Sequence, residues 1–261
     1  MLMKVLITGA GSGIGKATLE KLLEKENEVI AFDIDQDALS RLPEEVTKHH
    51  GDVYDEEKVS EVVEEEDFEV LINCAGYYEL GSIEDMDSET VENHFQTNVF
   101  GTLNLIRNAA PHLREQSGRI VNVSSVAGRI SMPFYGTYCA TKFSIEAISD
   151  SLRYEMEPFD VDVVIVEPGP INTGFNERAR QKLEKYLPDS VYSDRYQKVL
   201  EDGGRAEVGA EKVAKTIVRA VESSEPRNRY TVTWEAWLLP KLKRFLPSKS
   251  WDYIIRKGMD Y

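Results

Sequence analysis

The stretch "KVLITGAGSGIGKATLEKLL", residues 4–23, places a short apolar run, a glycine-rich turn and a helical pattern in direct succession. Lys4–Thr8 is dominated by β-branched and aliphatic residues, which is typical of a buried strand. From Ile14 to Lys25 the apolar side chains recur at helical spacing. The glycines between these segments permit a tight turn, so the chain can pass directly from strand to helix. The stretch therefore predicts a strand–turn–helix unit.

The same alternation of short apolar runs and longer helical segments continues along the chain. Six further strands are predicted at residues 28–32, 47–50, 69–73, 119–124, 162–167 and 229–233. Further helices are predicted at residues 55–66, 88–114, 137–157 and 210–222. This order is typical of an α/β fold with one doubly wound sheet, here of seven parallel strands, and helices on both faces. Right-handed crossovers would bring the carboxyl ends of the strands to one edge, where we expect a ligand to bind.

A length of 261 residues is compatible with a single domain spanning residues 1–261. Prolines, glycines and scattered aromatic residues interrupt the alternation at about residues 170–207, which predicts a lid over the carboxyl edge of the sheet. Two roles stay open for the aromatic residues near this lid: they line an apolar pocket, or they pack the lid onto the domain. They are Phe134, Tyr135, Phe175, Tyr186, Tyr192 and Tyr196.

The composition argues against several classes of function. A net charge of −15 and a pI of about 4.8 disfavour a nucleic-acid partner, because a phosphate backbone needs a basic surface. The two cysteines, Cys74 and Cys139, lie far apart and no secretory signal is seen, so a cytoplasmic location is expected. The four histidines show no ligand spacing, which predicts no metal site. No apolar run reaches the roughly 18 residues that a membrane span needs.

A basic and apolar segment occupies residues 236–261. Basic segments with tryptophan can lie on a membrane surface, so one interpretation is a peripheral membrane contact. The other interpretation is docking on the protein, at the substrate site or at a subunit contact. We favour docking, because Pro240 and Pro247 would divide the segment into short pieces and the acidic protein would attract it.

The glycine-rich turn has the residues of an anion-binding site. In "TGAGSGIG", Thr8–Gly15, the glycines allow close approach of the backbone, and the following helix offers free N–H groups to a phosphate. Asp33, at the end of the second predicted strand, can accept hydrogen bonds from the ribose hydroxyls of NAD and would repel the 2′-phosphate of NADP. The pattern therefore favours NAD over NADP as cofactor. A turn role for Asp33 within "DIDQD" is the alternative.

Tyr138 and Lys142 lie four residues apart in "GTYCATKFSIEAISDSL", residues 136–152, a stretch that otherwise reads as an apolar-faced helix. Residues at this spacing share a helix face, so a phenol and an ammonium group would sit together. A cation beside a phenol favours the phenolate, which suits a group that exchanges a proton near neutral pH. The spacing alone is common and is also compatible with a solvated or core-edge role.

Five motifs occur in order along the chain: "TGAGSGIG", "NCAG" at residues 73–76, Ser125 thirteen residues before Tyr138, "YCATK", and "PGPINT" at residues 168–173. Together they resemble the short-chain dehydrogenase/reductase (SDR) family, and the resemblance extends over essentially the whole chain. Within that family, the segments around Ser125, Tyr138 and Pro168 are similar to the hydroxysteroid and retinol dehydrogenase branch. The resemblance implies a Rossmann-type fold and an NAD(P)-dependent oxidoreductase that acts on CH–OH groups.

The resemblance also implies a substrate and an assembly. The substrate would be a hydrophobic alcohol or ketone, steroid-like or retinoid-like by analogy with that branch. The protein would be a homodimer or homotetramer built on the helices at residues 88–114 and 137–157.

The resemblance assigns catalytic roles to Asn98, Ser125, Tyr138 and Lys142. Tyr138 would protonate a carbonyl oxygen or deprotonate a hydroxyl group, with its pKa lowered by Lys142. Ser125 would donate a hydrogen bond to the substrate oxygen, and it fits the thirteen-residue spacing better than Ser124. Asn98, in "NHFQTNVFGT", would hold a water that links the lysine to solvent. The alternative for Asn98 is a buried amide paired with backbone.

Further residues are implied as cofactor contacts. Lys142 would bond the nicotinamide ribose hydroxyls as well as act on Tyr138. The other contacts run from the pyrophosphate turn through the adenine and ribose pockets to the carboxamide segment: Gly9, Ser12, Gly13, Ile14, Gly15, Asp33, Asp52, Val53, Asn73, Ala75, Gly76, Tyr138, Pro168, Ile171 and Thr173. Cys74 departs from the family pattern, which usually has asparagine there, and this bears on strand packing more than on activity.

Two functions from other classes remain as alternatives. A catalytically silent, dinucleotide-sensing regulatory protein would keep the fold and lose the tyrosine or the lysine, and both are present. A sugar-nucleotide epimerase or dehydratase would use the same pair of residues. Such enzymes generally have a longer carboxyl-terminal domain and a different glycine spacing, neither of which is seen here.

Overall fold

The predicted strand–turn–helix unit forms at the start of the chain, as strand β1 (Lys4–Thr8) and helix α1 (Gly13–Leu23). The structure is a computed structural model and describes residues 2–172, 174–201 and 208–258. Ser12 is the N-cap residue of α1, and no side-chain hydrogen bond caps the helix there. The first N–H groups of α1 therefore remain available at the carboxyl end of β1.

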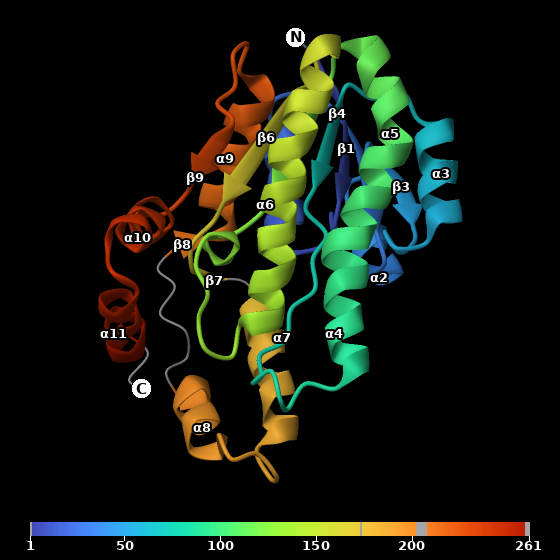
Figure 1. The fold of residues 1–261 in the computed structure, drawn as a ribbon. Coiled ribbons are helices and arrows are strands. Elements are labelled where there is room, and N and C mark those ends of the chain that lie inside the picture. Colours follow the sequence, from blue (N-terminus) through green and yellow to red (C-terminus); the bar gives the residue numbers. More distant parts are fainter. Residues whose placement is uncertain (1, 173, 202–207, 259–261) are drawn as a thin grey trace.

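The central sheet has seven strands in the order β3-β2-β1-β4-β5-β6-β9 (Figure 1). The strands that join β1 are β2 (Glu28–Asp33), β3 (Thr47–His50), β4 (Val70–Asn73), β5 (Arg119–Val123), β6 (Asp162–Glu167) and β9 (Arg229–Thr231). Every neighbouring pair is parallel. The strand order reverses between β1 and β4, so the sheet is doubly wound and the predicted Rossmann-type fold is confirmed.

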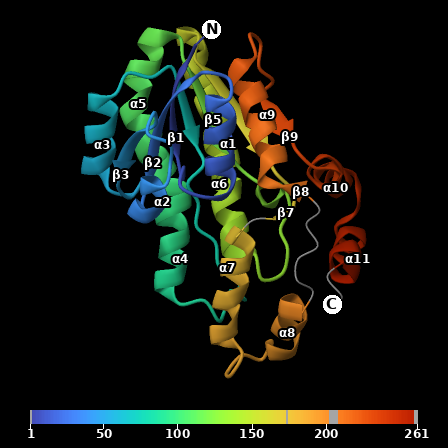
Figure 2. The same cartoon turned by 180° about the vertical axis from the view of Figure 1, so that it is seen from behind.

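Helices cover both faces of the sheet, as the two opposite views show (Figures 1 and 2). One face carries α1, α2 (Gln36–Ser40) and α9 (Ala210–Glu222), and the other carries α3 (Glu56–Glu65), α4 (Ser88–Phe95), α5 (Thr102–Gln116) and α6 (Gly136–Met156). Successive residues of β1 point to opposite faces. Val5 and Ile7 pack with Leu19 of α1, whereas Leu6 packs with Leu105 of α5. Both faces of the central strands are therefore buried, which is why β1 and β4–β6 are largely apolar, whereas the edge strand β3 is polar.

The helix predicted at residues 88–114 is interrupted. A π-helical turn, η1 (Gln96–Gly101), separates α4 from α5 and contains Asn98. Such turns insert one residue into the helical ladder and often occur at functional sites. The hydrophobic spacing of the sequence runs through the turn, so it carries no signal for this change.

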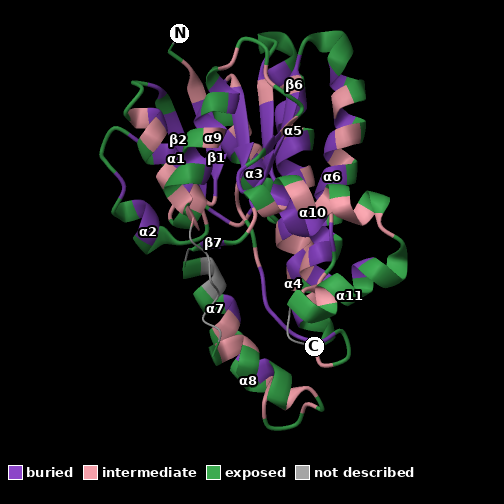
Figure 3. Cartoon of the chain, turned by 90° about the vertical axis from the view of Figure 1, so that its left-hand side faces the viewer, coloured by how far each residue is buried: buried purple, intermediate pink, exposed green. Residues whose placement is uncertain are grey.

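The lid predicted at about residues 170–207 contains two helices. Strand β7 (Ile171–Asn172) leads into α7 (Gly174–Leu183), the 3₁₀ turn η4 (Glu184–Tyr186) and α8 (Ser193–Glu201). Strand β7 pairs in parallel with β8 (Val208–Gly209) as a separate two-stranded sheet. Figures 1 and 3 show α7 and α8 projecting beyond the carboxyl edge of the central sheet.

Two carboxylates hold the lid to the loop after β4. Glu79 is buried and accepts hydrogen bonds from Lys182 at 2.6 Å and Lys185 at 3.0 Å. The hydroxyl of Tyr196, which is fully buried in α8, donates to Asp85. Because each contact pairs a group of the lid with a group of the domain, the lid is part of the folded unit rather than a loose excursion.

The basic segment forms two helices, α10 (Trp234–Phe245) and α11 (Ser248–Gly258). Their inner faces dock on the protein: Ala236 and Trp251 are buried against Val126 and Ile130 of the loop after β5. That loop includes the 3₁₀ turn η2 (Val126–Gly128), and a second turn, η3 (Glu157–Phe159), follows α6. None of the described helices is both long and apolar enough to span a lipid bilayer.

One expectation for this segment is wrong. Pro240 lies inside α10 and does not divide it, whereas Pro247 does separate α10 from α11. A proline within a helix removes one backbone hydrogen bond. Helix α10 tolerates this loss because Leu239 and Leu242, on either side of the proline, pack against the apolar cluster around Trp251.

Candidate active site

A cavity of about 760 Å³ lies at the carboxyl edge of the sheet, between the β1–α1 turn, the start of α6 and the lid helix α7. The structure places most of the predicted site residues on its wall: Gly9, Ser12, Gly13, Ile14, Gly15, Asp33, Asp52, Val53, Ala75, Gly76, Ser125, Tyr138, Lys142, Pro168 and Ile171. Asn73 and Asn98 are not on this wall. Thr173 lies outside the described residues.

The glycine turn forms a backbone cradle at one end of the cavity. Gly9 and Gly13 have φ angles of +65° and +54°, a conformation that residues with a side chain rarely adopt. A Cβ atom on Gly15 would lie 1.9 Å from the carbonyl oxygen of Gly9. The turn can therefore pass close beneath the N-terminus of α1, whose free N–H groups suit an anion.

Asp33 stabilises a turn and also faces the cavity. Its carboxylate accepts hydrogen bonds from the backbone N–H of Gly11 at 2.7 Å and of Asp35 at 2.9 Å, so it stabilises both turns. It also lines the cavity. Each carboxylate oxygen can accept a second hydrogen bond, which leaves capacity for a hydroxyl group of a ligand.

Tyr138 and Lys142 lie in the first turns of α6, with the lysine Nζ 5.8 Å from the centre of the tyrosine ring. Lys142 donates a hydrogen bond to the carbonyl of Val123 at 2.9 Å. Burial lowers the pKa of Lys142 to about 8. Burial also raises the pKa of Tyr138, and the hydroxyl of Ser125 acts against this shift. The phenol is therefore protonated near neutral pH in the protein by itself.

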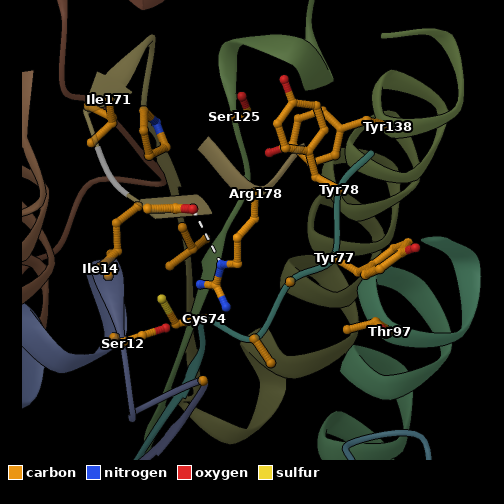
Figure 4. A pocket seen from close by; sticks show the side chains of 18 of the residues that line it. Ser12, Ile14, Cys74, Tyr77, Tyr78, Thr97, Ser125, Tyr138, Ile171 and Arg178 are labelled. Atoms are coloured by element: carbon orange, nitrogen blue, oxygen red, sulfur yellow. Dashed lines mark hydrogen bonds between the residues drawn. The ribbon is translucent and has the colours of Figure 1, made fainter. Parts of the chain in front are cut away.

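Ser125 lies at the end of β5, next to the ring of Tyr138 (Figure 4). Its hydroxyl accepts a hydrogen bond from the backbone N–H of Ala127 at 3.1 Å, which leaves the hydroxyl proton free to donate. Ser124 also reaches the cavity wall, and both serines are buried. Ser125 therefore lies beside Tyr138 on the cavity wall, and its predicted role as a donor to a substrate oxygen stays a prediction.

Asn73 and Asn98, the two asparagines predicted as site residues, are buried and form hydrogen bonds with other parts of the protein. Asn98 accepts from the backbone N–H of Tyr77 at 2.6 Å and donates to its carbonyl at 2.8 Å and to Thr141 at 3.0 Å. Asn73 donates to Asn122 at 2.8 Å, within the sheet. The amide of Asn98 thus pairs with backbone, and its predicted role in holding a water stays a prediction.

The aromatic residues divide between the two roles left open. Tyr135 lines the cavity, together with Tyr77 and Tyr78, which the sequence prediction missed although they directly follow "NCAG". The ring of Tyr78 lies 4.8 Å from that of Tyr138. The remaining rings pack the lid onto the domain: Phe134, Tyr186, Tyr192 and Tyr196. The side chain of Phe175 is outside the described residues.

The lid brings cations to the cavity that the prediction also missed. Arg178, Arg180 and Lys182 of α7 line the wall. Lys182 is neutralised by Glu79, but within residues 174–201 and the other described segments no carboxylate pairs with either arginine. Figure 4 shows Arg178 between the glycine turn and Tyr77. No local pattern marks these residues, because their position depends on where the lid folds.

Cys74 faces the same cavity (Figure 4). Burial raises the pKa of its thiol to about 12, so the group is neutral and a poor nucleophile at physiological pH. Among the described residues, no three His, Cys, Asp or Glu side chains are grouped as a metal ion would require. Neither Cys74 nor a metal cluster among the described residues accounts for chemistry in the cavity, whereas the phenol of Tyr138 and the ammonium of Lys142 lie together on α6.

A buried charged cluster supports the loop that carries Ser125. Glu146, one turn after Lys142 on α6, forms an ion pair with Arg229, which also reaches Glu167 at 3.1 Å. Arg129, directly after η2, pairs with Glu167 at 2.9 Å. Burial and the neighbouring Glu167 raise the pKa of Glu146 to about 7, although Arg229 opposes the shift.

This pKa shift predicts a pH dependence of stability that Glu146→Gln removes. The folded-state pKa of about 7 exceeds the ordinary value of 4.5, so the folded protein holds a proton that the unfolded chain releases. The corresponding stability is present below the ordinary pKa and is lost as the pH rises through about 7. The loss amounts to at most about 3 kcal/mol. Urea denaturation across this pH range measures it, with exposed Glu115→Gln as the control. Equal pH slopes in both variants would contradict the assignment.

Comparisons with known proteins identify relatives along most of the chain. The family model described as short chain dehydrogenase matches residues 3–184. A probable short-chain type dehydrogenase/reductase VdlC of Helicobacter pylori is 34% identical, with 96% of each chain covered. The 3-ketodihydrosphingosine reductase of Bacteroides thetaiotaomicron is 32% identical over 97% of this chain and 96% of its own. Human 17-beta-hydroxysteroid dehydrogenase type 6 is 29% identical over 97% of this chain and 88% of its own.

The fold has solved counterparts. The crystal structure of a short chain dehydrogenase from Burkholderia cenocepacia in complex with NADP superposes with a TM-score of 0.80. The two chains are 23% identical, and the match covers 97% of each. Because the family model, the relatives and the arrangement of Ser125, Tyr138 and Lys142 agree, the chain belongs to the short-chain dehydrogenase/reductase family and is an oxidoreductase that acts on CH–OH groups.

Proposed function

We propose that the protein is an NAD(H)-dependent oxidoreductase that interconverts a hydrophobic ketone and a secondary alcohol, with Tyr138 as the acid/base. The observation that carries this proposal is the convergence of Tyr138, Ser125 and Lys142 on the same cavity as the glycine turn and Asp33. A proton donor, a hydrogen-bond donor and an anion-binding helix terminus are the parts that such a reaction needs.

The residues on the wall fit a dinucleotide. Gly9 and Gly15 leave no room for a side chain, so the backbone of the turn can lie close to a pyrophosphate at the start of α1. Asp33 lies where it can accept from the hydroxyl groups of an adenosine ribose. Arg178 of the lid adds a positive charge to the wall of the same cavity, between the glycine turn and Tyr77 in the view of Figure 4. When bound, a nicotinamide dinucleotide supplies or accepts the hydride.

The side chains of α6 and β5 handle the proton. Tyr138 donates its phenolic proton to the oxygen of the ketone as that oxygen becomes an alcohol, and it accepts the proton in the reverse direction. Its raised pKa keeps the phenol protonated, which suits reduction. Ser125 donates a hydrogen bond to the same oxygen while negative charge develops on it. The ammonium of Lys142 stabilises the phenolate that remains.

The substrate half of the cavity is apolar. Tyr78, Leu80, Met132, Tyr135 and Val199 line it, so it suits a hydrophobic ketone better than a sugar or a small acid. Two relatives have names that point the same way, since one is a 3-ketodihydrosphingosine reductase and the other a 17-beta-hydroxysteroid dehydrogenase. The first supports a long-chain substrate and the second a steroid-like one.

A panel assay tests the proposed function. Purified protein is incubated with NADH or NADPH and a series of ketones that includes long-chain, steroidal and retinoid compounds, and consumption of the reduced dinucleotide is measured. Turnover of at least one apolar ketone with NADH is expected. Tight dinucleotide binding without turnover of any ketone or of the matching alcohols would instead favour the catalytically silent regulatory protein.

Asp33→Asn tests the cofactor preference separately. The amide keeps an oxygen that accepts from the backbone N–H of Gly11 but loses the charge that repels a 2′-phosphate. The ratio of NADPH affinity to NADH affinity should rise by about tenfold, as expected when one partly exposed charge repulsion is removed. Fluorescence titration of each dinucleotide measures the ratio. Asp37→Asn, which neutralises a nearby carboxylate that does not line the cavity, should leave it unchanged. An unchanged ratio in Asp33→Asn as well would refute the role of Asp33.

A further inference from the structure

Helix α10 has a second apolar face that the protein does not cover. Trp234, Trp237 and Phe245 are 66%, 54% and 80% exposed. Trp237, Lys241 and Phe245 lie three, seven and eleven residues after Trp234. At this spacing all four side chains share one side of the helix. The ammonium of Lys241 lies 3.5 Å from the centre of the Trp237 ring. Single exposed apolar residues are ordinary, but an aromatic stripe of this length on one helix marks an interaction surface.

This outer stripe is distinct from the face that docks. The inner face of α10 consists of Ala236, Leu239, Leu242 and Leu246, which belong to the cluster around Trp251. These residues lie on the opposite side of the helix from Trp237. Docking on the protein thus accounts for one face and leaves the aromatic face without a function in the fold.

Helix α11 repeats the arrangement. Trp251 points inward and is 7% exposed, whereas Tyr253 is 65% and Ile254 38% exposed. Figure 3 shows α11 as mostly exposed. Lys249, Arg256 and Lys257 accompany these residues on the exposed side of the helix. The outer faces of both helices therefore combine large aromatic rings with basic groups.

The charge of this surface is opposite to that of the protein. Residues 234–258 contain six Lys and Arg residues and two acidic residues, a net charge of +4 in a chain of net charge −15. A second copy of this surface would be repelled by like charge. An anionic lipid surface offers the complementary charge, and tryptophan and tyrosine prefer the boundary between lipid headgroups and acyl chains.

We propose that the outer faces of α10 and α11 bind the surface of an anionic lipid bilayer. The aromatic rings enter the headgroup region, and the basic side chains contact lipid phosphates. The two interpretations of residues 236–261 drawn from the sequence then apply to opposite faces of the same helices. A bilayer contact places the protein where apolar ketones partition, but the binding itself does not depend on which substrate the enzyme uses.

Vesicle binding tests this proposal with the full chain. Co-sedimentation is measured with vesicles of phosphatidylcholine alone and of phosphatidylcholine mixed with phosphatidylglycerol. All three tryptophans lie in the two helices, Trp234 and Trp237 on the outer face and Trp251 on the inner face, so a change in the intrinsic tryptophan emission reports on these helices. We expect binding to the anionic vesicles that is about tenfold tighter than to neutral ones, weakened by salt, with a blue shift of the emission.

Matched variants locate the surface. The triple variant Trp234→Gln, Trp237→Gln and Phe245→Gln should reduce binding to anionic vesicles by about tenfold or more while leaving NADH affinity unchanged. The control is Tyr154→Gln with Phe159→Gln, which removes two aromatic rings that are 74% and 46% exposed at the far end of α6. The control should bind like the wild type. The proposal is overturned if the wild-type protein does not bind anionic vesicles at low salt, or if the triple variant binds them as well as the wild type. It is also overturned if light scattering without lipid shows that the wild type is a dimer and the triple variant a monomer.

Discussion

Tyr138→Phe should lower kcat by about a thousandfold while the affinity for NADH stays within about twofold of the wild type. A positioned acid or base contributes about 10²- to 10⁴-fold to a rate, and removal of the phenolic oxygen leaves no other proton donor of α6 in this position. The ring itself remains, so its contact with Tyr78 at 4.8 Å between ring centres is kept. Steady-state kinetics with the best ketone of the panel and fluorescence titration of NADH measure the two quantities.

Tyr135→Phe is the matched control for this prediction. Tyr135 is a neighbouring phenol that lines the same cavity. Its loss should change KM more than kcat, because it contacts the substrate region without holding the transferred proton. If Tyr138→Phe keeps kcat within about tenfold of the wild type, the acid/base assignment is wrong, whereas the family and the dinucleotide site are unaffected.

Gly15→Ala should abolish dinucleotide binding under conditions in which Gly13→Ala only weakens it. A Cβ atom at residue 15 would lie 1.9 Å from the carbonyl oxygen of Gly9 and 2.7 Å from its carbonyl carbon. Both are backbone atoms of the glycine turn. The clash can therefore be relieved only if the backbone of the turn moves away from α1. We expect at least a hundredfold loss of NADH affinity, together with a drop of about 1–3 kcal/mol in the free energy of unfolding from overpacking.

Gly13→Ala distinguishes the effect of backbone strain from the effect of the steric clash at Gly15. Apart from its chain neighbours and the backbone of α1, no heavy atom of the described residues lies within 4 Å of a Cβ built at Gly13, so the main requirement for glycine here is the φ angle of +54°. Gly13→Ala should therefore cost about 1 kcal/mol of stability and leave measurable NADH binding. Urea denaturation and NADH titration of both variants give the comparison. Equal effects of the two substitutions would show that the close approach of Gly15 to Gly9 does not shape the site.

The arrangement of the sheet was predictable because its signals are local. Lys4–Thr8 and the other apolar runs are buried on both sides, and this leaves short continuous stretches that the sequence displays directly. The edge that carries Tyr138 and Asp33 follows from the handedness of the crossovers. Most cofactor contacts expected from the motifs accordingly lie on one cavity wall.

The interruptions and the lid were less predictable. The π-helical turn at Asn98 is stabilised by hydrogen bonds to Tyr77 and Thr141, which are distant in sequence. The aromatic residues near the lid were ambiguous, because an apolar ring suits a pocket wall and a packed interior equally well. Only the position of α8, held by Tyr196 and Asp85, shows that most of them are packing residues.

The sequence by itself determined the features whose physical cause lies within a few neighbouring residues: the strand and helix periodicities, the glycine turn, and the Tyr138–Lys142 pair on one turn of helix. Tertiary structure alone decided which distant residues meet. It brings Arg178 of the lid into the same cavity as the glycine turn, keeps Asn73 within the sheet, and gives α10 both a buried face and an exposed aromatic face. The reason is that side-chain environment depends on packing between elements, which chain neighbours do not encode.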